Sequence, residues 1–465
     1  MRARALTIAG LVATVACLGG STPTAAPAGQ IVLSVDTDAP VVSESPRPID
    51  PGTPIPLFDR IRFDVVGSPT AACDGCTQDF ALTSESLVAG TVSVGVAPPP
   101  GDDGWTARIR IYALRLEQPG GDPDVGSTMD VTVALPAVEA TGIVEASVVL
   151  STDGTGQPVG QDAPVSPVFG APAPSLVGTW PAAQRTSCSG DPPAGMACVP
   201  GGAFLMGAPV DHYMPGAVAT WHRLVVLAPF FLDRTEVTGT RAFAGGIAAN
   251  GVDGWSGSTA GTSPFDWCTG QVPAGARSPL PLNCVLQSAA RGFCQKAGGD
   301  LPTEAELEYV MGGLQMTPYV WGADLPHCAD AVWGRNGFGL LDDVVPQDCL
   351  IDSMALGAQG GPELPGSGGR DSLALPGGPI LDLTGNLAEL ARDDYQTQTE
   401  PCWSVAGVLH DPVCTTPSPS LGAQITSRGG SWSAGGTFLE ADWRQYGASG
   451  TVSPSIGFRC MKPAE

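Results

Sequence analysis

Glycine and proline interrupt this sequence too often for long helices to form. The chain contains 62 glycines and 45 prolines among its 465 residues. Glycine weakens a helix interior, and proline breaks it because proline lacks the backbone N–H. The composition therefore predicts short strands, turns and ordered loops with few helices. A single hydrophobic core usually divides at this length, so we expect two domains.

The charge balance excludes one class of partner. Acidic residues number 46 and basic residues 22, which gives a net charge of −24 at pH 7. Nucleic-acid phosphates and anionic lipid headgroups repel a surface of this sign, so we expect no nucleic-acid partner. Acidic groups do suit hard cations such as calcium. The hydrophobic share of 43% is enough for packed cores and argues against disorder.

The first 29 residues predict an export signal. A charged start precedes an apolar segment over residues 5–16, which is too short to span a bilayer. The tetrapeptide that ends at Cys17 resembles a bacterial lipobox, in which Cys17 would be lipidated, although Thr14 replaces the usual leucine. The alternative is ordinary cleavage near Ala25, which would release a periplasmic or secreted protein. We expect an exported protein and favour a lipid anchor in the cell envelope.

Twelve cysteines remain after Cys17 is set aside, an even number that favours disulfides in an exported protein. Local spacing suggests five pairs and leaves Cys294 and Cys460 over. A bond between those two would close a long loop and constrain the unfolded chain. The suggested pairs are Cys73 with Cys76, Cys188 with Cys198, Cys268 with Cys284, Cys328 with Cys349, and Cys402 with Cys414.

Residues 30–155 predict an all-β sandwich. Short runs of alternating apolar and polar residues are separated by Pro, Gly and Asp turns, which is typical of antiparallel strands. The alternation over residues 105–111 places the arginines on the solvent-exposed face. Cys73 and Cys76 have the spacing of a redox pair, but we interpret them as a structural disulfide. The expected strands lie at 31–35, 61–65, 91–96, 107–114 and 129–135.

A proline-spaced linker over residues 156–185 should be extended and should separate two independent units. The second unit, 186–465, contains the convincing helices. Thr303 and Glu306 fit a capping box, which predicts a helix over 304–311. We also expect a helix over 288–297 and another that follows Thr238 and ends at Asn250.

Seven motifs in this second unit occur in an ordered series. They are residues 199–207 (VPGGAFLMG), 230–238 (FFLDRTEVT), 281–285 (PLNCV), 301–309 (LPTEAELEY), 383–389 (LTGNLAE), 428–432 (RGGSW) and 457–459 (GFR). Together they resemble the formylglycine-generating enzyme (sulfatase-modifying factor) family over roughly 270 residues. The resemblance implies an α+β, C-type-lectin-like domain with little regular secondary structure, and a disulfide between Cys294 and Cys460.

The resemblance also implies a missing catalytic pair. Active members oxidise a sulfatase cysteine to formylglycine with copper held by two cysteines, because monovalent copper prefers thiolates. The matching positions here are Ala434 and a position near Leu439, and no cysteine lies between Ser431 and Ile456. We therefore expect neither copper nor the formylglycine reaction. Nonheme iron is also unexpected, because the four histidines lack ligand spacing; they are His212, His222, His327 and His410.

Structural calcium is the cofactor that the resemblance favours. It carries over Asp382 and Glu389 as side-chain ligands, with backbone oxygens from Gly385 and Leu387. The alternative is a glycine turn with solvated acids. A second site would involve Asp330, although the spacing beyond Trp333 departs from the family.

A candidate ligand groove also follows from the resemblance. Arg444 matches an arginine that lines the substrate groove, and Ser431 and Trp432 lie beside the lost catalytic pair. Ser455 replaces a family asparagine, and Ala388 replaces a family tryptophan, so the groove is reshaped. Arg444 could equally be an ordinary surface ion-pair partner.

These features predict a noncatalytic, calcium-stabilised binding platform held at the membrane by a lipid anchor. Its partner would be an exported protein, a peptide or a glycan. The alternative from another class is an oxidoreductase of the formylglycine-generating or nonheme-iron type that acts on an exported substrate. A third hypothesis is a structural spacer of the envelope without a ligand.

Overall fold

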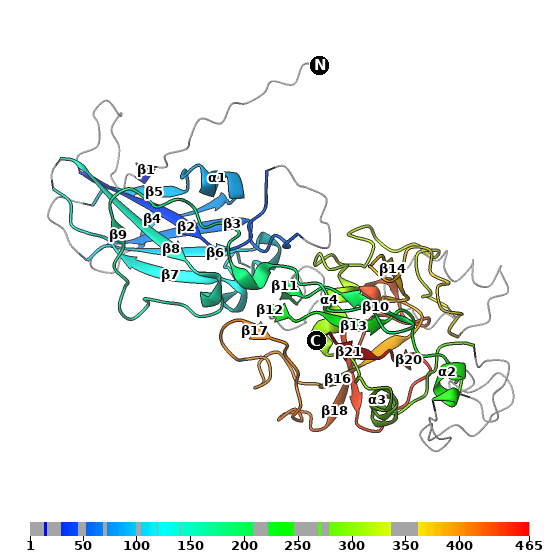
Figure 1. Ribbon diagram of the computed structural model, residues 1–465. Helices are drawn as coiled ribbons and strands as arrows, with labels where there is room; N and C mark the ends of the chain where they lie inside the picture. The colour runs from blue at the N-terminus through cyan, green and yellow to red at the C-terminus, as the bar shows by residue number, and fades with distance from the viewer. Residues whose placement is uncertain are drawn as a thin grey trace, which may run out of the picture.

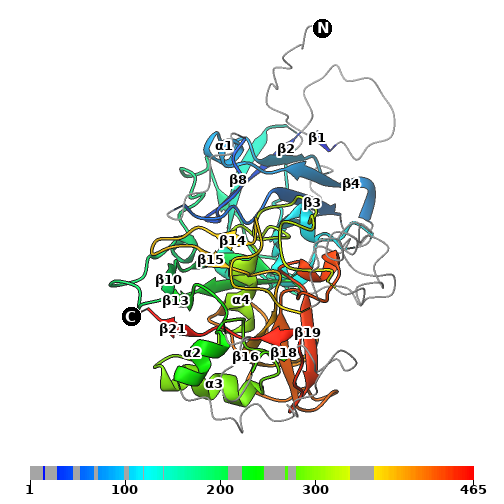
Figure 2. The same ribbon diagram turned by 90° about the vertical axis from the view of Figure 1, so that its right-hand side faces the viewer.

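The computed structural model describes residues 14–15, 29–44, 53–67, 72–98, 104–118, 120–139, 141–207, 222–245, 268–270, 279–335 and 361–464. Mixed sheets with few, short helices make up these residues. Strands from the first third of the chain lie at one end of the molecule and later strands at the other (Figures 1 and 2). Cys17 and His212 lie outside the described residues. No helix in the described ranges is long and apolar enough to cross a membrane.

Two sheets form the N-terminal end. The first has the order β1-β5-β2-β8-β9, with β1 Thr14–Val15, β5 Ser93–Val96, β2 Gln30–Thr37, β8 Ile143–Leu150 and β9 Val168–Phe169. The second has the order β4-β3-β6-β7, with β4 Ala72–Ala81, β3 Arg60–Val66, β6 Thr106–Tyr112 and β7 Met129–Ala134. A short helix, α1 (Ser84–Val88), follows β4.

The five predicted strands correspond to β2, β3, β5, β6 and β7, and their inward side chains share one core. Burial alternates along β2, as the sequence pattern requires. The expectation of purely antiparallel pairing is wrong, because β2 pairs in parallel with β8 from Gln30 opposite Ile143. A parallel partner can be distant in sequence, so local turn signals do not reveal it.

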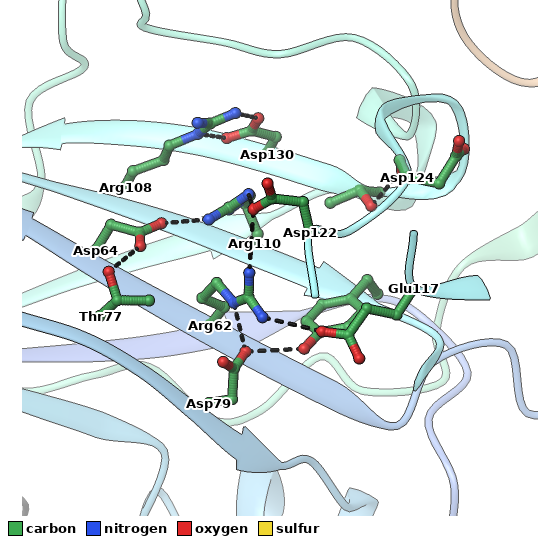
Figure 3. Close-up of polar contacts among 12 residues, drawn as sticks. Arg62, Asp64, Thr77, Asp79, Arg108, Arg110, Glu117, Asp122, Asp124 and Asp130 are labelled. Atoms are coloured by element: carbon green, nitrogen blue, oxygen red, sulfur yellow. Dashed lines mark hydrogen bonds and ion pairs between the residues drawn. The ribbon is translucent and has the colours of Figure 1, made fainter. Parts of the chain in front are cut away.

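The arginines of β6 correct a second expectation. Arg110 is largely buried, and its Nη2 lies 2.6 Å from Oδ2 of Asp64 on β3. Arg62 on β3 lies 2.6 Å from Asp79, and Arg108 binds Asp130 through two nitrogens (Figure 3). The strand register places arginine and aspartate side by side, so the charged side chains of this face pair with one another and Arg110 is covered, while Arg108 stays 34% exposed.

Residues 156–185 contain turns, the short strand β9 and a 3₁₀ turn, and they pack on the first unit. Val159 forms a β-bridge to Val131 of β7, and the indole N–H of the buried Trp180 donates to Asp153 at 2.7 Å. Trp180 belongs to the same core as Leu205 and residues of the N-terminal sheets. The linker therefore joins two units that share a core, and the expectation of independent units is corrected.

The C-terminal end contains four small sheets. Two three-stranded sheets have the orders β10-β13-β21 and β11-β12-β17, with β10 Met196–Val199, β13 Phe230–Asp233, β21 Met461–Pro463, β11 Gly202–Met206, β12 Arg223–Leu227 and β17 Leu409–His410. A two-stranded sheet pairs β14 Ser372–Leu373 with β15 Ile380–Leu381. The four-stranded sheet has the order β19-β18-β16-β20, with β19 Arg444–Ala448, β18 Gln424–Arg428, β16 Ala388–Asp394 and β20 Ile456–Gly457.

Three helices pack against these sheets. The prediction for α4 (Glu304–Met311) is confirmed, including the capping box of Thr303 and Glu306. Helix α3 (Gln287–Lys296) begins one residue before its predicted start. Helix α2 (Gly239–Ala244) begins after Thr238 as predicted, but its end at Asn250 is wrong because Gly245 caps it. The 3₁₀ turns are Leu114–Leu116, Val125–Ser127, Thr152–Gly154, Pro181–Ala183 and Gly436–Leu439.

Four predicted disulfides are present. They join Cys188 to Cys198, Cys268 to Cys284, Cys294 to Cys460, and Cys402 to Cys414. Cys76 and Cys328 are also disulfide-bonded. Their predicted partners, Cys73 and Cys349, lie outside the residues whose side chains are described.

Candidate functional site

A cavity of about 440 Å³ opens beside β19. The chain reaches it after β18, where Gly429 adopts a φ of +73° that favours glycine. This turn sends the next residues along the cavity wall, and the segment before β20 forms the opposite part. The described lining residues are Ser431, Ser433, Ala434, Gly435, Phe438, Trp443, Arg444, Gln445, Tyr446, Ser453, Ser455 and Ile456.

Two of the three predicted groove residues line this cavity. Ser431 is buried, and its hydroxyl lies 3.3 Å from that of Ser433. Trp432 does not line the cavity; it packs with Val332 and Leu387, and its indole N–H donates to the Pro454 carbonyl at 3.0 Å. Trp432 therefore supports the wall from behind.

Arg444 lines the cavity, but its guanidinium is bound elsewhere. Its Nε and Nη2 bind the carboxylate of Glu304 on α4, with 3.0 Å between Nη2 and Oε2. The guanidinium also lies 4.7 Å from the ring centre of Tyr395. Burial opposes ionisation of Glu304, but Arg444 and Arg428 outweigh it and lower its pKa. Arg444 is thus a buried ion-pair partner, contrary to the surface alternative.

The two positions that the sequence resemblance aligned with the family cysteines have different surroundings. Ala434 lines the cavity, whereas Leu439 is buried in a cluster with Tyr319 and Trp333. Among the described lining residues there is no cysteine, histidine or carboxylate. Serine hydroxyls and aromatic rings provide most of the functional groups, and they can donate and accept hydrogen bonds or stack on a ligand.

The predicted calcium ligands lie in a buried acidic cluster around Arg459. Both oxygens of Glu389 accept from Nε of Arg459, at 2.7 and 2.8 Å. Asp382 accepts from the Gly366 N–H through Oδ2, while its buried Oδ1 has no hydrogen-bond partner in the described structure. Asp382 also adopts a φ of +54°. One ligand is therefore free to accept a cation, and the other already binds an arginine.

Negative charge in this cluster exceeds positive charge. Burial, followed by Asp382 and Glu389, raises the pKa of Glu236 well above its usual range. Burial and the neighbouring Asp382 raise the pKa of Asp371 to about 7. Three buried carboxylates, those of Glu236, Asp382 and Glu389, thus act on one guanidinium, that of Arg459. This excess fits a bound cation, although Arg459 competes for Glu389.

Asp330, the remaining predicted ligand, and His222, which was not expected to bind a metal, have other partners. Oδ2 of Asp330 accepts from the His327 N–H at 2.8 Å and lies 3.6 Å from Arg370. His222 is buried 3.7 Å from Asp124. Within the described ranges, no group of three or more His, Cys, Asp or Glu residues is placed to hold a metal. The predicted calcium site depends on two carboxylates and two carbonyls, so that finding does not address it.

Sequence reasoning missed the partners of these groups. Glu304 is far in sequence from Arg444, and Glu236 is far from Asp382. Nothing in the local sequence pattern connects the two members of either pair. The positions of Glu304 and Glu236 within two of the seven motifs, 301–309 and 230–238, were the available signal.

Comparison with known proteins supports the resemblance. Residues 183–342 match the sulfatase-modifying factor enzyme 1-like domain family. The formylglycine-generating enzyme of Streptomyces coelicolor is 33% identical over 33% of this chain and 58% of its own length. That of Thermomonospora curvata is 30% identical over 28% of this chain and 53% of its own length. The chain thus spans somewhat more than half of these relatives.

A solved structure, that of PvdO from Pseudomonas aeruginosa, is 20% identical, with a TM-score of 0.38 over 58% of this chain and 94% of that one. The assignment rests on the sequence matches and not on this likeness. The cavity beside β19 lies beyond the matched residues. Residues 183–342 thus match the sulfatase-modifying factor enzyme 1-like domain family, and part of the chain is similar to formylglycine-generating enzymes.

Proposed function

We propose that the protein is an exported, lipid-anchored surface protein whose C-terminal domain binds a ligand in the cavity beside β19. The lining of that cavity carries the proposal. Ala434 stands where the resemblance implies the first copper-binding cysteine, and it contributes only a methyl group. Copper chemistry of the family type needs two thiolates, which this wall does not supply.

The favoured ligand is uncharged, such as a glycan or a peptide segment of an exported protein. Paired serines line two parts of the wall, with the hydroxyls of Ser453 and Ser455 3.1 Å apart. Tyr446 is exposed at the cavity and stacks on Tyr395. The guanidinium of Arg444 is already neutralised by Glu304. Hydroxyls and aromatic faces without a free charge suit sugars and backbone amides.

Titration of the purified full chain with neutral N-acetylglucosamine oligosaccharides and with an end-blocked peptide tests this ligand class. Ala434→Trp should fill the cavity and abolish binding. Ala406→Trp, the same change at an exposed position of the same domain, should leave binding intact. Equal binding by both variants, or no binding of either ligand class to the wild type, would contradict the proposal.

Structural calcium at Asp382 and Glu389 is part of this proposal, with Gly385 and Leu387 as backbone ligands and a further site near Asp330. The unpartnered Oδ1 of Asp382 and the excess buried acid support it. Calcium would neutralise the buried acidic cluster and order a loop whose backbone forms few hydrogen bonds to neighbouring strands. Elemental analysis should find calcium, and chelation should lower the melting temperature of the full chain. A melting curve unchanged by chelation, with no calcium bound, would refute this part.

An oxidoreductase acting on an exported substrate is the second candidate, and the family match favours it. Copper or iron at about one atom per chain after purification would support this alternative. In that case a ligand set other than the cavity beside β19 would hold the metal, and oxidase assays would take precedence over binding studies.

Export and anchoring rest on residues 1–29 and on the disulfides, which persist in oxidising compartments. Cys17→Ser should move the protein from the membrane fraction to the soluble exported fraction. Retention of the variant in the membrane fraction would argue against a lipid on Cys17.

A further inference from the structure

A second cavity, of about 210 Å³, lies where the N-terminal unit meets the C-terminal domain. Arg115 enters it from the 3₁₀ turn Leu114–Leu116 of the first unit. The C-terminal domain supplies the other walls, from β11, α4 and two loops. None of its described lining residues belongs to the cavity beside β19.

Arg115 is the unusual group in this cavity. Its Nη2 donates to the Leu205 carbonyl at 3.3 Å and lies 3.3 Å from Sδ of Met316. In the described structure, no carboxylate lies within ion-pair distance of its guanidinium. Burial lowers the pKa of Arg115, and the charges of Glu308, Asp442 and Asp59 oppose that shift without reversing it. A half-buried guanidinium without an anion at ion-pair distance can gain from one, so this geometry favours an anionic ligand.

Glu308, one of the two acids in the lining, already binds groups of the C-terminal domain. Oε1 of Glu308 accepts from the Gly207 N–H at 2.6 Å, and Oε2 lies 2.7 Å from Nη2 of Arg428. Glu308 is therefore held by the C-terminal domain and turned toward Arg428. Asp442 acts on Arg115 through space without forming an ion pair with it. Arg115 remains the cation available to a ligand.

The other walls are mostly apolar. The apolar lining residues include Phe204, Leu205, Met316, Pro318 and Ala441. Tyr309 also lines it, and its buried hydroxyl has no hydrogen-bond partner within the described structure. Arg115 is the one cation among the described lining residues, which also include Glu308 and Asp442, and a cation beside apolar walls can bind an anion with an apolar body.

We propose that this cavity binds a small carboxylate that carries an apolar group, through the guanidinium of Arg115. The guanidinium can pair with both carboxylate oxygens, and the apolar group would lie against Phe204 and Met316. The proposal goes beyond the function proposed above and depends on a different cavity. Because its walls come from both units, a bound carboxylate would stabilise their junction.

Calorimetric titration of the full chain with benzoate and with benzamide tests the proposal. The two probes have nearly the same shape, but only benzoate carries the charge. We expect about one benzoate per chain and at least about tenfold weaker binding of benzamide. Arg115→Met should weaken benzoate binding at least about tenfold, whereas Arg60→Met, which removes the same charge from β3 outside the cavity, should bind as the wild type does.

Because Arg115→Met also loses the hydrogen bond to Leu205, Arg115→Lys serves as a second variant that keeps the charge. For each variant, the melting temperature with benzoate is compared with the melting temperature of the same variant without benzoate. A shift retained in Arg115→Lys and lost in Arg115→Met supports charge recognition. Equal shifts in both variants, equal binding of benzoate and benzamide, or no benzoate binding to the wild type would overturn the proposal.

The carboxylate could belong to a free acid or to the end of a peptide chain, and one further comparison separates these sources. A short peptide that ends in phenylalanine is titrated with its terminus free and amidated. Tighter binding of the free terminus than of benzoate identifies a chain end. Weaker binding identifies a free acid, and the carboxylate chemistry holds in both cases.

Discussion

The N-terminal and C-terminal ends of this molecule differ in how their backbone is held. Strands of seven to ten residues form most of the N-terminal sheets, and their ladders order the chain. In the C-terminal end the strands have two to seven residues, and long loops join them. At least four disulfides, counted between described cysteines, and the buried arginines Arg428 and Arg459 cross-link these loops.

This comparison indicates that an irregular domain can replace ladder hydrogen bonds with covalent and ionic cross-links. Arg459 alone binds Glu389 and three backbone carbonyls, those of Asp233, Leu381 and Asp382. One side chain thus joins three segments that no common sheet connects. Such links are sensitive to single substitutions, which suggests how to test the difference between the two ends.

The largest effect should come from the disulfide between Cys294 and Cys460. Its sequence separation is 166, so the chain-entropy relation predicts a loss of about 5 kcal/mol when both cysteines become alanine. The bond between Cys188 and Cys198 spans only 10 residues and should contribute about 3 kcal/mol. Urea unfolding of the two double variants measures both values. A smaller loss for the long loop than for the short one would contradict the comparison.

Removal of one buried arginine should rank second. Arg459→Met leaves Glu389 buried without its partner, which should cost about 3–5 kcal/mol of unfolding free energy. Arg108→Met at the N-terminal end is the matched change. Arg108 is 34% exposed, so water screens this pair from the arginine side although Asp130 is buried, and we expect a cost of about 1–2 kcal/mol. Equal costs would mean that buried charge has no special role in the C-terminal domain.

The pH dependence of stability should show the buried acids of the C-terminal end. Burial, and then the charge of Glu304, raise the pKa of Asp393 to about 7. The folded protein therefore holds a proton that the unfolded chain releases near pH 4, and stability falls as the pH rises from about 4 to 7. The expected fall is on the order of 2–4 kcal/mol.

Unfolding free energies of Asp393→Asn, measured across that range, provide the check. The variant cannot titrate at this position, so its stability should decline less steeply with pH than that of the wild type. An unchanged slope would show that Asp393 ionises in the folded protein as it does in the unfolded chain.

The smallest loss of stability should come from removing a helix N-cap, and the N-terminal and C-terminal ends of the molecule each contain a helix with a capping box. Thr303→Ala removes the cap of the buried helix α4, at a cost of about 1–2 kcal/mol. Thr83→Ala removes the same capping box from α1, where water can replace the lost bond, at a cost of about 0.5–1 kcal/mol. Thermal unfolding of the pair measures the difference. A greater loss at Thr83 would reverse the expected order.

Local signals predicted the parts of the fold that local interactions determine. Helix α4 follows from Thr303, Glu306 and the glycines that end it, all within eleven residues. The strand β2 follows from its own alternation. Its parallel partner β8 and the burial of Arg110 did not follow, because both depend on which strands become neighbours.

The candidate site shows the same division. Its chain segments were predicted from motifs, but the direction of the Arg444 side chain depends on Glu304, 140 residues away. Trp432 lies behind the wall because Pro454 accepts its N–H, which no spacing rule indicates. The cavity at Arg115 is formed by both units, so neither unit's sequence alone could predict it.

The most direct test of the central claim is an aldehyde assay on the purified full chain supplied with copper. A cysteine-containing sulfatase peptide is incubated with it and analysed by mass spectrometry, beside a formylglycine-generating enzyme as the positive control. The account predicts that the peptide keeps its thiol, because Ala434 and Leu439 cannot bind copper as the family cysteines do. Repeated conversion of peptide thiol to aldehyde by this chain would contradict the account.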